Sequence, residues 1–280
     1  MDRPVAIVTG ASSGIGQSTC QALRHKGFDV YAAARRVEQM SALEAAGIQV
    51  ERLDVTDDAS MVALVDPVVR EAGRIDVLVN NAGYGSYGAL EEVPMDEARR
   101  QFDVNVFGLA RLTQLVLPHM RARRSGRIVN ISSMGGKIHE PLGGWYHATK
   151  FAVEGLSDSL RMELAPFGID VVVIEPGAIR TEWAGIAAEH VRAVSAHGPY
   201  ARQARDVATV LDAGSGPGAR GSSPVVVADA VVKAATARRP RTRYVVGLGA
   251  RPALFARAVL TDRGFDRMLR LAYWYARRLA

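Results

Sequence analysis

The feature that most constrains this chain is a short apolar strand that leads directly into a glycine-rich turn and then into a helix. The strand is Val5 to Val8, the turn runs from Thr9 to Gly16, and residues 17–26 follow a helical pattern. A continuous apolar run of this length is typical of a strand buried on both faces of a parallel sheet. Because parallel strands are joined by crossover helices, this start predicts an α/β fold.

The rest of the chain repeats the alternation of strand and helix. Further strands are predicted at residues 30–34, 48–53, 75–79, 127–131, 170–174 and 243–247. We therefore expect one Rossmann-like, doubly wound parallel sheet of about seven strands, with helices on both faces, over residues 1–250. A long helix is predicted within residues 98–120, and residues 251–280 are expected to form a basic amphipathic helical extension.

Composition excludes several classes of protein. With 280 residues, 48% of them apolar, the chain is long enough for one sizeable core. The single cysteine, Cys20, rules out an internal disulfide, and no cysteine and histidine cluster has metal-ligand spacing, so no metal site is expected. The net charge of +6 comes with no nucleic-acid-binding motif, so no nucleic acid partner is expected. No secretory signal or membrane span is visible, which favours a cytoplasmic protein.

The glycine-rich turn indicates a dinucleotide site. Its spacing is Gly-x-x-x-Gly-x-Gly, over Gly10, Gly14 and Gly16. Glycines allow the backbone to approach a pyrophosphate, whose charge then meets the positive end of the following helix. The second strand ends in Arg35 and Arg36 with no carboxylate, which favours the 2'-phosphate of NADP(H) over the free hydroxyl of NAD(H).

Other small and polar residues follow strands at the same sheet edge, where ligands bind in open α/β sheets. Asp54 and Val55 follow the third strand, and Asn81, Ala82 and Gly83 follow the fourth. Pro176 and Gly177 follow the sixth strand. Within the long predicted helix, Asn105 either satisfies backbone groups at a distortion beside Gly108 or holds a water molecule.

A tyrosine and a lysine stand four residues apart where a further helix begins. This spacing brings Tyr146 and Lys150 to one helix face. A nearby ammonium stabilises a phenolate, so we expect Lys150 to lower the pKa of Tyr146 toward the range useful for acid and base catalysis. The pair alone is a weak signal, because the same spacing occurs by chance on exposed helices.

Taken together, these motifs resemble the short-chain dehydrogenase/reductase family over about residues 4–247. The resemblance rests on the glycine turn, Asp54, Asn80 to Gly83, Asn105, Ser133, the Tyr146–Lys150 pair, and Pro176 with Gly177. It implies that Tyr146 exchanges a proton with the substrate oxygen, that Ser133 orients that oxygen, and that Lys150 also binds the nicotinamide ribose. Asn105 would hold a water molecule linked to Lys150. Ser132 competes with Ser133, since only one of two successive strand residues faces the site.

The resemblance also assigns residues to the cofactor. It implies that the phosphate turn is lined by Ser12, Ser13 and Ile15, and that Ile179 and Thr181 approach the nicotinamide amide. Because Ala34 occupies the position that is acidic in NAD-dependent members and Arg35 follows it, the resemblance also implies NADP(H). The expected activity is hydride transfer between NADP(H) and a carbonyl or secondary alcohol. The alternatives are an NADP(H)-binding regulator without turnover and a sugar epimerase or dehydratase of the extended type.

The substrate is not named by the sequence. Residues 139–145, Trp183 and Ile186 are expected to border the pocket and favour a bulky apolar, steroid-like, retinoid-like or aromatic ketone or alcohol, although Trp183 and Ile186 are equally consistent with core packing. For His139, Glu140 and His147 we favour a surface loop. Residues 236–280 hold 11 arginines and two aspartates. Their terminal helix is interpreted as a cover over the pocket, a contact between subunits of a homo-oligomer, or a peripheral membrane anchor.

Overall fold

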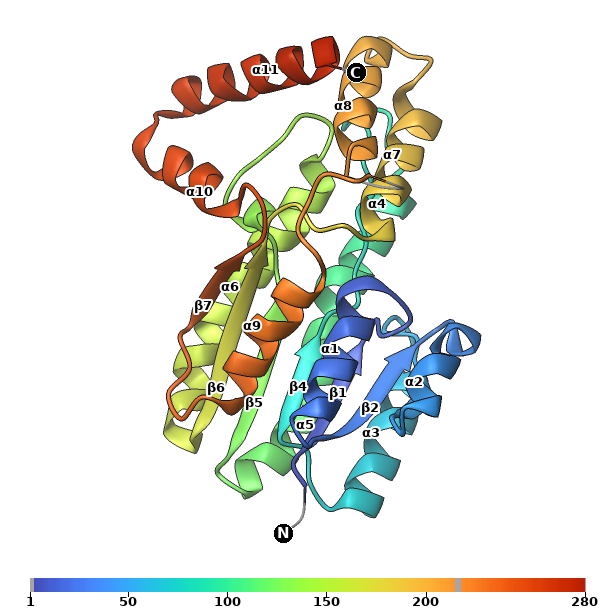
Figure 1. Cartoon of the computed structure of the whole chain (residues 1–280), viewed down its shortest axis with the longest axis vertical. Helices are drawn as coiled ribbons and strands as arrows, with labels where there is room; N and C mark the ends of the chain where they lie inside the picture. The colour runs from blue at the N-terminus through green and yellow to red at the C-terminus, as the bar shows by residue number, and fades with distance from the viewer. Residues whose placement is uncertain (1–2, 215–217, 280) are drawn as a thin grey trace.

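The computed structural model describes residues 3–214 and 218–279, in which strands and helices alternate along most of the chain (Figure 1). The strands are β1 (Val5–Thr9), β2 (Asp29–Ala34), β3 (Gln49–Arg52), β4 (Val77–Asn80), β5 (Gly126–Ile131), β6 (Ile169–Pro176) and β7 (Arg243–Val246). The helices that connect or follow them are α1 (Gly14–His25), α2 (Ser41–Ala45), α3 (Asp58–Ala72), α4 (Met95–Phe102), α5 (Leu109–Ala122), α6 (Gly144–Leu164), α7 (Glu182–Ser195), α8 (Ala201–Asp212), α9 (Val225–Thr236), α10 (Ala250–Val259) and α11 (Asp262–Leu279).

The seven strands form one parallel sheet in the order β3-β2-β1-β4-β5-β6-β7. This confirms the predicted doubly wound sheet. From β1 the chain first builds outward through β2 and β3, and then returns to the other side of β1 with β4. The order therefore reverses between β1 and β4, and a crevice for ligands opens beyond their carboxyl ends.

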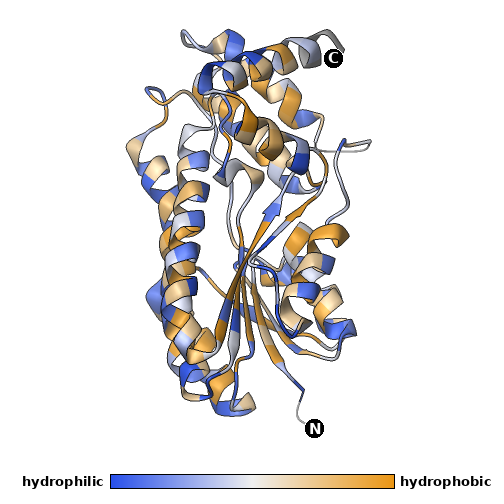
Figure 2. Cartoon of the chain, turned by 90° about the vertical axis from the view of Figure 1, so that its left-hand side faces the viewer, coloured by the Kyte–Doolittle hydropathy of each residue, from blue (hydrophilic) through white to orange (hydrophobic). Residues whose placement is uncertain are grey.

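The sheet is covered on both faces. One apolar cluster joins the sheet to α1 and α9, and the other joins it to α3, α5 and the end of α6. Figure 2 shows the largely hydrophobic strands between these helix layers. Since both faces of the central strands are buried, these strands read as largely apolar runs, which is why they could be recognised in the sequence, whereas the edge strand β3 is polar and mostly exposed.

The helix predicted within residues 98–120 is interrupted. It consists of α4, a π-helical segment from Asp103 to Gly108, and α5. Gly108 lies against the backbone of Val55, because a Cβ atom at this glycine would be 2.4 Å from the Val55 carbonyl oxygen. The distortion beside Gly108 that the sequence offered as one explanation for Asn105 is therefore present, and it lies where π-type segments often occur, near a functional site.

Helices α7, α8, α10 and α11 lie beyond the carboxyl ends of the strands, and α11 runs across the top of the molecule in Figure 1. The predicted C-terminal extension is thus helical, but it is divided into two helices. Phe265 anchors α11, because its side chain is fully buried and its ring lies 5.3 Å from that of His139. Within the described part of the chain, every helix is too short or too polar to cross a lipid bilayer.

Candidate active site

The ends of β1 and β4 are joined by a side-chain clamp. The hydroxyl of Thr9 accepts hydrogen bonds from the backbone N–H groups of Asn81 and Ala82, at 3.0 and 2.9 Å. The Asn81 amide in turn donates to the Thr9 carbonyl oxygen at 2.9 Å. These bonds fix the two strand ends between which the crevice opens.

The glycine turn is packed too closely for side chains. A Cβ atom at Gly16 would lie 2.2 Å from the Gly10 carbonyl oxygen, and Gly10 and Gly14 have φ angles of +64° and +53°. Helix α1 begins at Gly14, so its first free N–H groups point toward the crevice. An anionic group is stabilised at such a helix start.

Two arginines stand at the end of β2, as the sequence predicts. Arg35 and Arg36 are exposed and line the same cavity as the glycine turn. Arg36 donates to the Ser12 hydroxyl at 3.4 Å and forms an ion pair with Glu182, also at 3.4 Å. Burial opposes the ionisation of Asp54, but hydrogen bonds from Thr56 and the charges of Arg35 and Arg100 outweigh it and lower the pKa of Asp54. This end of the cavity therefore carries two arginines together with the carboxylates of Asp54 and Glu182.

Tyr146 and Lys150 occupy the first two turns of α6, as predicted, and both are buried. The Lys150 ammonium donates to the Ile131 carbonyl oxygen at 2.9 Å and lies 6.0 Å from the centre of the Tyr146 ring. Ser133, just after β5, hydrogen-bonds the Tyr146 side chain. The neighbouring Ser132 hydroxyl is buried and has no partner among the described residues. Of the two serines, Ser133 is therefore the one that reaches the tyrosine.

The pKa of Tyr146 does not follow the sequence argument, which expects Lys150 to lower it. Burial raises this pKa to about 12; the Ser133 hydrogen bond opposes the rise and the charge of Glu140 adds to it. Burial also lowers the pKa of Lys150 to about 8, although the charge of Glu154 opposes this effect. Desolvation therefore dominates both groups in this structure, and Tyr146 is a protonated phenol at neutral pH.

Asn105 lies in the π-helical segment and is buried. Its amide nitrogen donates to the Tyr84 carbonyl oxygen at 2.9 Å and to the Thr149 hydroxyl at 3.1 Å. Its side-chain oxygen accepts from the Tyr84 N–H at 3.0 Å. Asn105 thereby ties the loop after β4 to the helix that carries Tyr146 and Lys150, and the backbone groups that it satisfies are those of Tyr84 and not those of the distorted segment.

An aromatic wall borders Tyr146, and the sequence argument found only part of it. Trp183, an expected pocket residue, has its ring centre 4.9 Å from that of Tyr146. Tyr87 was not predicted; its ring centre lies 5.8 Å from Tyr146 and 5.9 Å from Trp183. Tyr273 of α11 also lines the cavity. The one signal for Tyr87 was its position in the loop after β4, at the ligand-binding edge of the sheet.

Two residues for which a surface loop was favoured lie at the cavity instead, and for Glu140 this agrees with the separate expectation that residues 139–145 border the pocket. His147 is buried, and its Nδ1 atom lies 2.9 Å from the Gly135 carbonyl oxygen. Glu140 lines the cavity, and its carboxylate accepts a hydrogen bond from the Tyr87 hydroxyl at 3.4 Å. The interpretation failed because the segment folds inward, where α11 covers it: His139 Nε2 lies 3.0 Å from an Asp266 oxygen.

A charge cluster built around two buried carboxylates lies behind α6, and the sequence argument did not predict it. Arg243, at the start of β7, pairs with Glu154 of α6 at 3.0 Å and with Glu175 of β6 at 3.3 Å. Lys137 pairs with the same two carboxylates, at 3.3 and 3.7 Å. Burial and the charge of Glu154 raise the pKa of Glu175. The cluster joins α6 to β6, the strand that ends at Pro176.

One cavity of about 570 Å³ connects these parts. Of the predicted site residues, it is lined by Gly10, Ser12, Ser13, Gly14, Ile15, Arg35, Arg36, Asp54, Val55, Asn81, Ala82, Gly83, Ser133, Tyr146, Lys150, Pro176, Gly177, Ile179 and Thr181. Gly16 and Asn105 lie behind the wall, where they support the turn and the catalytic helix. The described residues contain no cluster of acidic, histidine or cysteine side chains placed to hold a metal ion.

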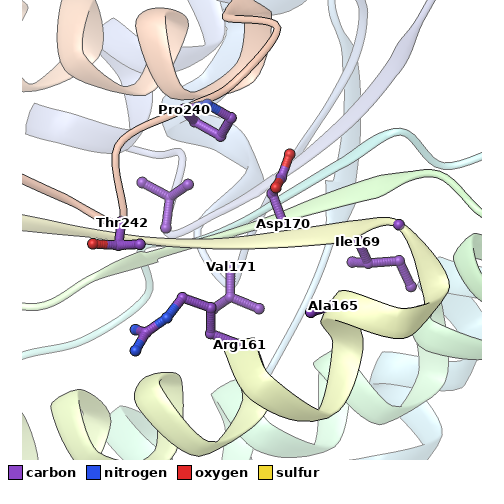
Figure 3. Close-up of a pocket in the computed structure, with 9 residues that line it drawn as sticks. Arg161, Ala165, Ile169, Asp170, Val171, Pro240 and Thr242 are labelled. Carbon is purple, nitrogen blue, oxygen red and sulfur yellow. The ribbon is translucent and has the colours of Figure 1, made fainter.

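The cavity fits a nicotinamide dinucleotide. The glycine turn at the start of α1 leaves room for a pyrophosphate to approach the backbone. Arg35 and Arg36 lie at one end of the cavity, and Tyr146 lies at the other. A smaller cavity of about 210 Å³ lies near the opposite end of β6 (Figure 3). Its lining, which includes Arg161, Asp170 and Thr242, contains none of the predicted site residues.

Comparison with known proteins gives the same assignment. The family model described as short chain dehydrogenase matches residues 4–191. The chain belongs to this family. A probable short-chain type dehydrogenase/reductase, VdlC, from Helicobacter pylori is 33% identical over 95% of this chain and 97% of its own length. A 3-ketodihydrosphingosine reductase from Bacteroides thetaiotaomicron is 41% identical over 65% of this chain and 66% of its own. An NADPH-dependent 3-dehydrocapnine reductase from Ornithobacterium rhinotracheale is 34% identical over 94% and 95%.

Solved structures of short-chain dehydrogenases share the fold. One from Streptomyces avermitilis has a TM-score of 0.80 and 37% identity, with 92% of this chain and 93% of the other covered. A metagenomic short-chain oxidoreductase in complex with NADP has a TM-score of 0.67 and 30% identity, over 87% and 96%. A short chain dehydrogenase/reductase from Burkholderia phymatum in complex with NAD has a TM-score of 0.79 and 26% identity, over 95% of each chain. Family members thus include complexes with either nicotinamide cofactor, and this chain is an oxidoreductase of that family.

Proposed function

We propose that this protein is an NADP(H)-dependent carbonyl reductase, acting in reverse as an alcohol dehydrogenase. The observation that carries the proposal is that Ser133, Tyr146 and Lys150 share one cavity with the glycine turn and the arginines of β2. A nicotinamide bound there supplies or accepts the hydride. The residues of this chain then have to hold the substrate oxygen and deliver or remove its proton.

Tyr146 is suited to the role of proton donor. Its phenol, with an ordinary pKa of about 10 that burial raises further, is protonated at neutral pH and can donate to the oxygen of a carbonyl as negative charge develops there. Ser133, hydrogen-bonded to Tyr146, would share that oxygen, and the buried ammonium of Lys150 would stabilise the phenolate left after proton transfer. Both effects act on charge that appears in the transition state.

The choice of NADP(H) rests on Arg35 and Arg36. Both are exposed at the end of β2, where an arginine can pair with a 2'-phosphate. Arg36 is held beside Ser12 and Glu182, whereas Arg35 forms no ion pair among the described residues. The NADP complex of a structural relative and the NADPH-dependent relative support this choice.

The cavity wall favours a bulky apolar substrate. Trp183, Leu211 and Tyr273 surround the side of the cavity next to Tyr146. The names of two relatives, a 3-ketodihydrosphingosine reductase and a 3-dehydrocapnine reductase, support ketone reduction as the reaction. Steroid-like, retinoid-like and aromatic ketones remain candidates along with aliphatic ones.

We also infer that the two faces of α11 have different functions, one toward the cavity and one toward a membrane surface. Tyr273 faces the cavity, whereas Leu271, Trp274 and Tyr275 are exposed on the helix together with Arg267 and Arg270. Exposed aromatic side chains among arginines suit the surface of an anionic lipid bilayer. Peripheral membrane contact is therefore our proposal for the outer face. Homo-oligomer formation stays a prediction of the sequence.

The experiment that tests the reaction follows NADPH absorbance with a panel of ketones, with NADH as the cofactor control. For any accepted ketone, Tyr146→Phe should lower kcat by about 10²- to 10⁴-fold, as expected for loss of a positioned proton donor. Tyr200→Phe, a change of the same kind outside the cavity lining, is the matched control. Equal turnover by Tyr146→Phe and the wild type would refute the assigned role.

A further inference from the structure

Glu140 is an acidic residue of the cavity that takes no part in the proposed hydride transfer. Glu140 precedes α6 and lines the cavity together with Tyr87, Tyr146 and Tyr273. The Tyr87 hydroxyl donates to its Oε2 atom at 3.4 Å, and the Tyr87 ring packs 5.8 Å from the ring of Tyr146. The carboxylate is therefore on the substrate side of the cavity, one aromatic ring away from the catalytic tyrosine.

The negative charge of Glu140 acts on the pKa values of three nearby tyrosines. It contributes to the raised pKa values of Tyr87, Tyr146 and Tyr273, after burial, which is the larger cause in each. Burial likewise raises the pKa of Glu140 itself, against the hydrogen bond from Tyr87 and the charge of His139. The acid is thus held in apolar surroundings that disfavour its ionised form.

The described residues give Glu140 no lysine or arginine partner. His139 Nε2 lies against Asp266 at 3.0 Å, and Lys150 Nζ donates to the Ile131 carbonyl oxygen. The other cavity cations, Arg35 and Arg36, belong to the end of the cavity beside the glycine turn. A carboxylate in an apolar wall is costly unless a cation or several donors accompany it. The missing partner can come from a ligand.

We propose that Glu140 and Tyr87 form a subsite for a protonated amine carried by the substrate near its reacting carbonyl. This inference rests on the proposed reductase function and narrows the substrate class to amino ketones with an apolar remainder. The ammonium would pair with the carboxylate while the carbonyl meets Tyr146 and Ser133. The remainder would lie along Trp183, Leu211 and Tyr273.

The kinetic test uses a matched pair of substrates. A long-chain 2-amino ketone and the same ketone with hydrogen in place of the amine are reduced with NADPH by wild type, Glu140→Gln and Glu163→Gln. Glu163 is an exposed glutamate on α6 and serves as the control. The ratio of kcat/KM between the two ketones should fall about 10- to 100-fold in Glu140→Gln, the size expected for one hydrogen-bonded charge pair. It should keep the wild-type value in Glu163→Gln.

A binding test makes the two proposals separable. Decylamine and decanol are titrated into wild type and Glu140→Gln by calorimetry, which needs no turnover. Preferential binding of decylamine that disappears in Glu140→Gln is the expected result. If ketones are reduced, but neither the ratio of kcat/KM between the two ketones nor the preference for decylamine over decanol depends on Glu140, the subsite is refuted and the reductase function stands. If amine binding depends on Glu140 but no ketone is reduced, the subsite stands and the reductase function is refuted.

Discussion

The buried ammonium of Lys150 makes the stability of the fold depend on alkaline pH. The Lys150 side chain is buried, and its ammonium donates a hydrogen bond to the Ile131 carbonyl oxygen. Burial lowers the pKa of this ammonium from 10.5 to about 8. Replacing Lys150 with methionine keeps an unbranched side chain of similar length and removes the ionisable group. The free energy of unfolding of the two proteins should then respond differently to pH.

The sign follows from where the proton is held. Below about pH 8, Lys150 is protonated in the folded and the unfolded chain, and the folded chain bears the full cost of burying the charge. Between about pH 8 and the ordinary 10.5, the unfolded chain keeps the proton and the folded chain loses it, so the free energy of unfolding rises with pH. The limiting slope is about 1.4 kcal/mol per pH unit, and the whole interval amounts to about 3 kcal/mol.

Urea unfolding followed by circular dichroism, at steps from about pH 7 to about pH 10.5, measures this effect. Burial raises the pKa values of Cys20 and Tyr146, which destabilises wild type and variant alike at high pH, so the quantity of interest is the difference between the two proteins. This difference should rise in favour of wild type above about pH 8. Lys233→Met, on an exposed position of α9, is the control and should show no such rise. Parallel pH curves for wild type and Lys150→Met would refute the reasoning.

Three further predictions concern the glycine turn, the arginines and α11. Gly16→Ala should lower the free energy of unfolding by about 1–3 kcal/mol, because its Cβ would lie 2.2 Å from the Gly10 carbonyl oxygen; urea unfolding checks this, and unchanged stability would contradict it. Arg35→Ser should raise the KM for NADPH about tenfold or more and leave the KM for NADH unchanged in steady-state kinetics, whereas an equal change for both cofactors would argue against a phosphate contact. The double variant Arg267→Glu, Arg270→Glu should sediment less than wild type with anionic liposomes and equally with neutral ones; no difference would exclude our membrane proposal.

Much of the fold could be predicted because its signals are local. Most strands are short, largely apolar runs, and the glycine turn follows the first strand directly, so the order of elements can be read from neighbouring residues. The sequence offered a distortion beside Gly108 as one explanation for Asn105, but it could not show that the helix is interrupted over residues 103–108, because apolar residues keep their helical spacing through that segment. Its cause is distant: Gly108 packs against the backbone of Val55.

The candidate site likewise contains residues that could be predicted from the sequence and residues that depend on contacts between distant segments. The proximity of Tyr146 and Lys150 could be predicted from their spacing at the start of α6, and Ser133 was expected from the resemblance to the family. Glu140 was expected at the pocket only as part of residues 139–145, and its contact with Tyr87 could not be predicted, since it depends on how two loops fold against each other. Burial, which determines the pKa of Tyr146, depends on the same packing, and this is why the sequence argument gave the wrong direction for it.

Helix α11 contributes to the wall against the substrate but not to the proposed cofactor site or the proposed proton donor. The residues that would bind the dinucleotide and move the proton lie between residues 10 and 181, whereas Tyr273 supplies part of the wall against the substrate. Exchange of residues 250–279 with those of a relative would therefore alter which ketones are accepted while leaving the redox machinery in place. For the proposed reductase, relatives that differ in substrate should therefore differ at Tyr273 as well as at the rest of the wall, which is formed by Tyr87, Glu140, Trp183 and Leu211.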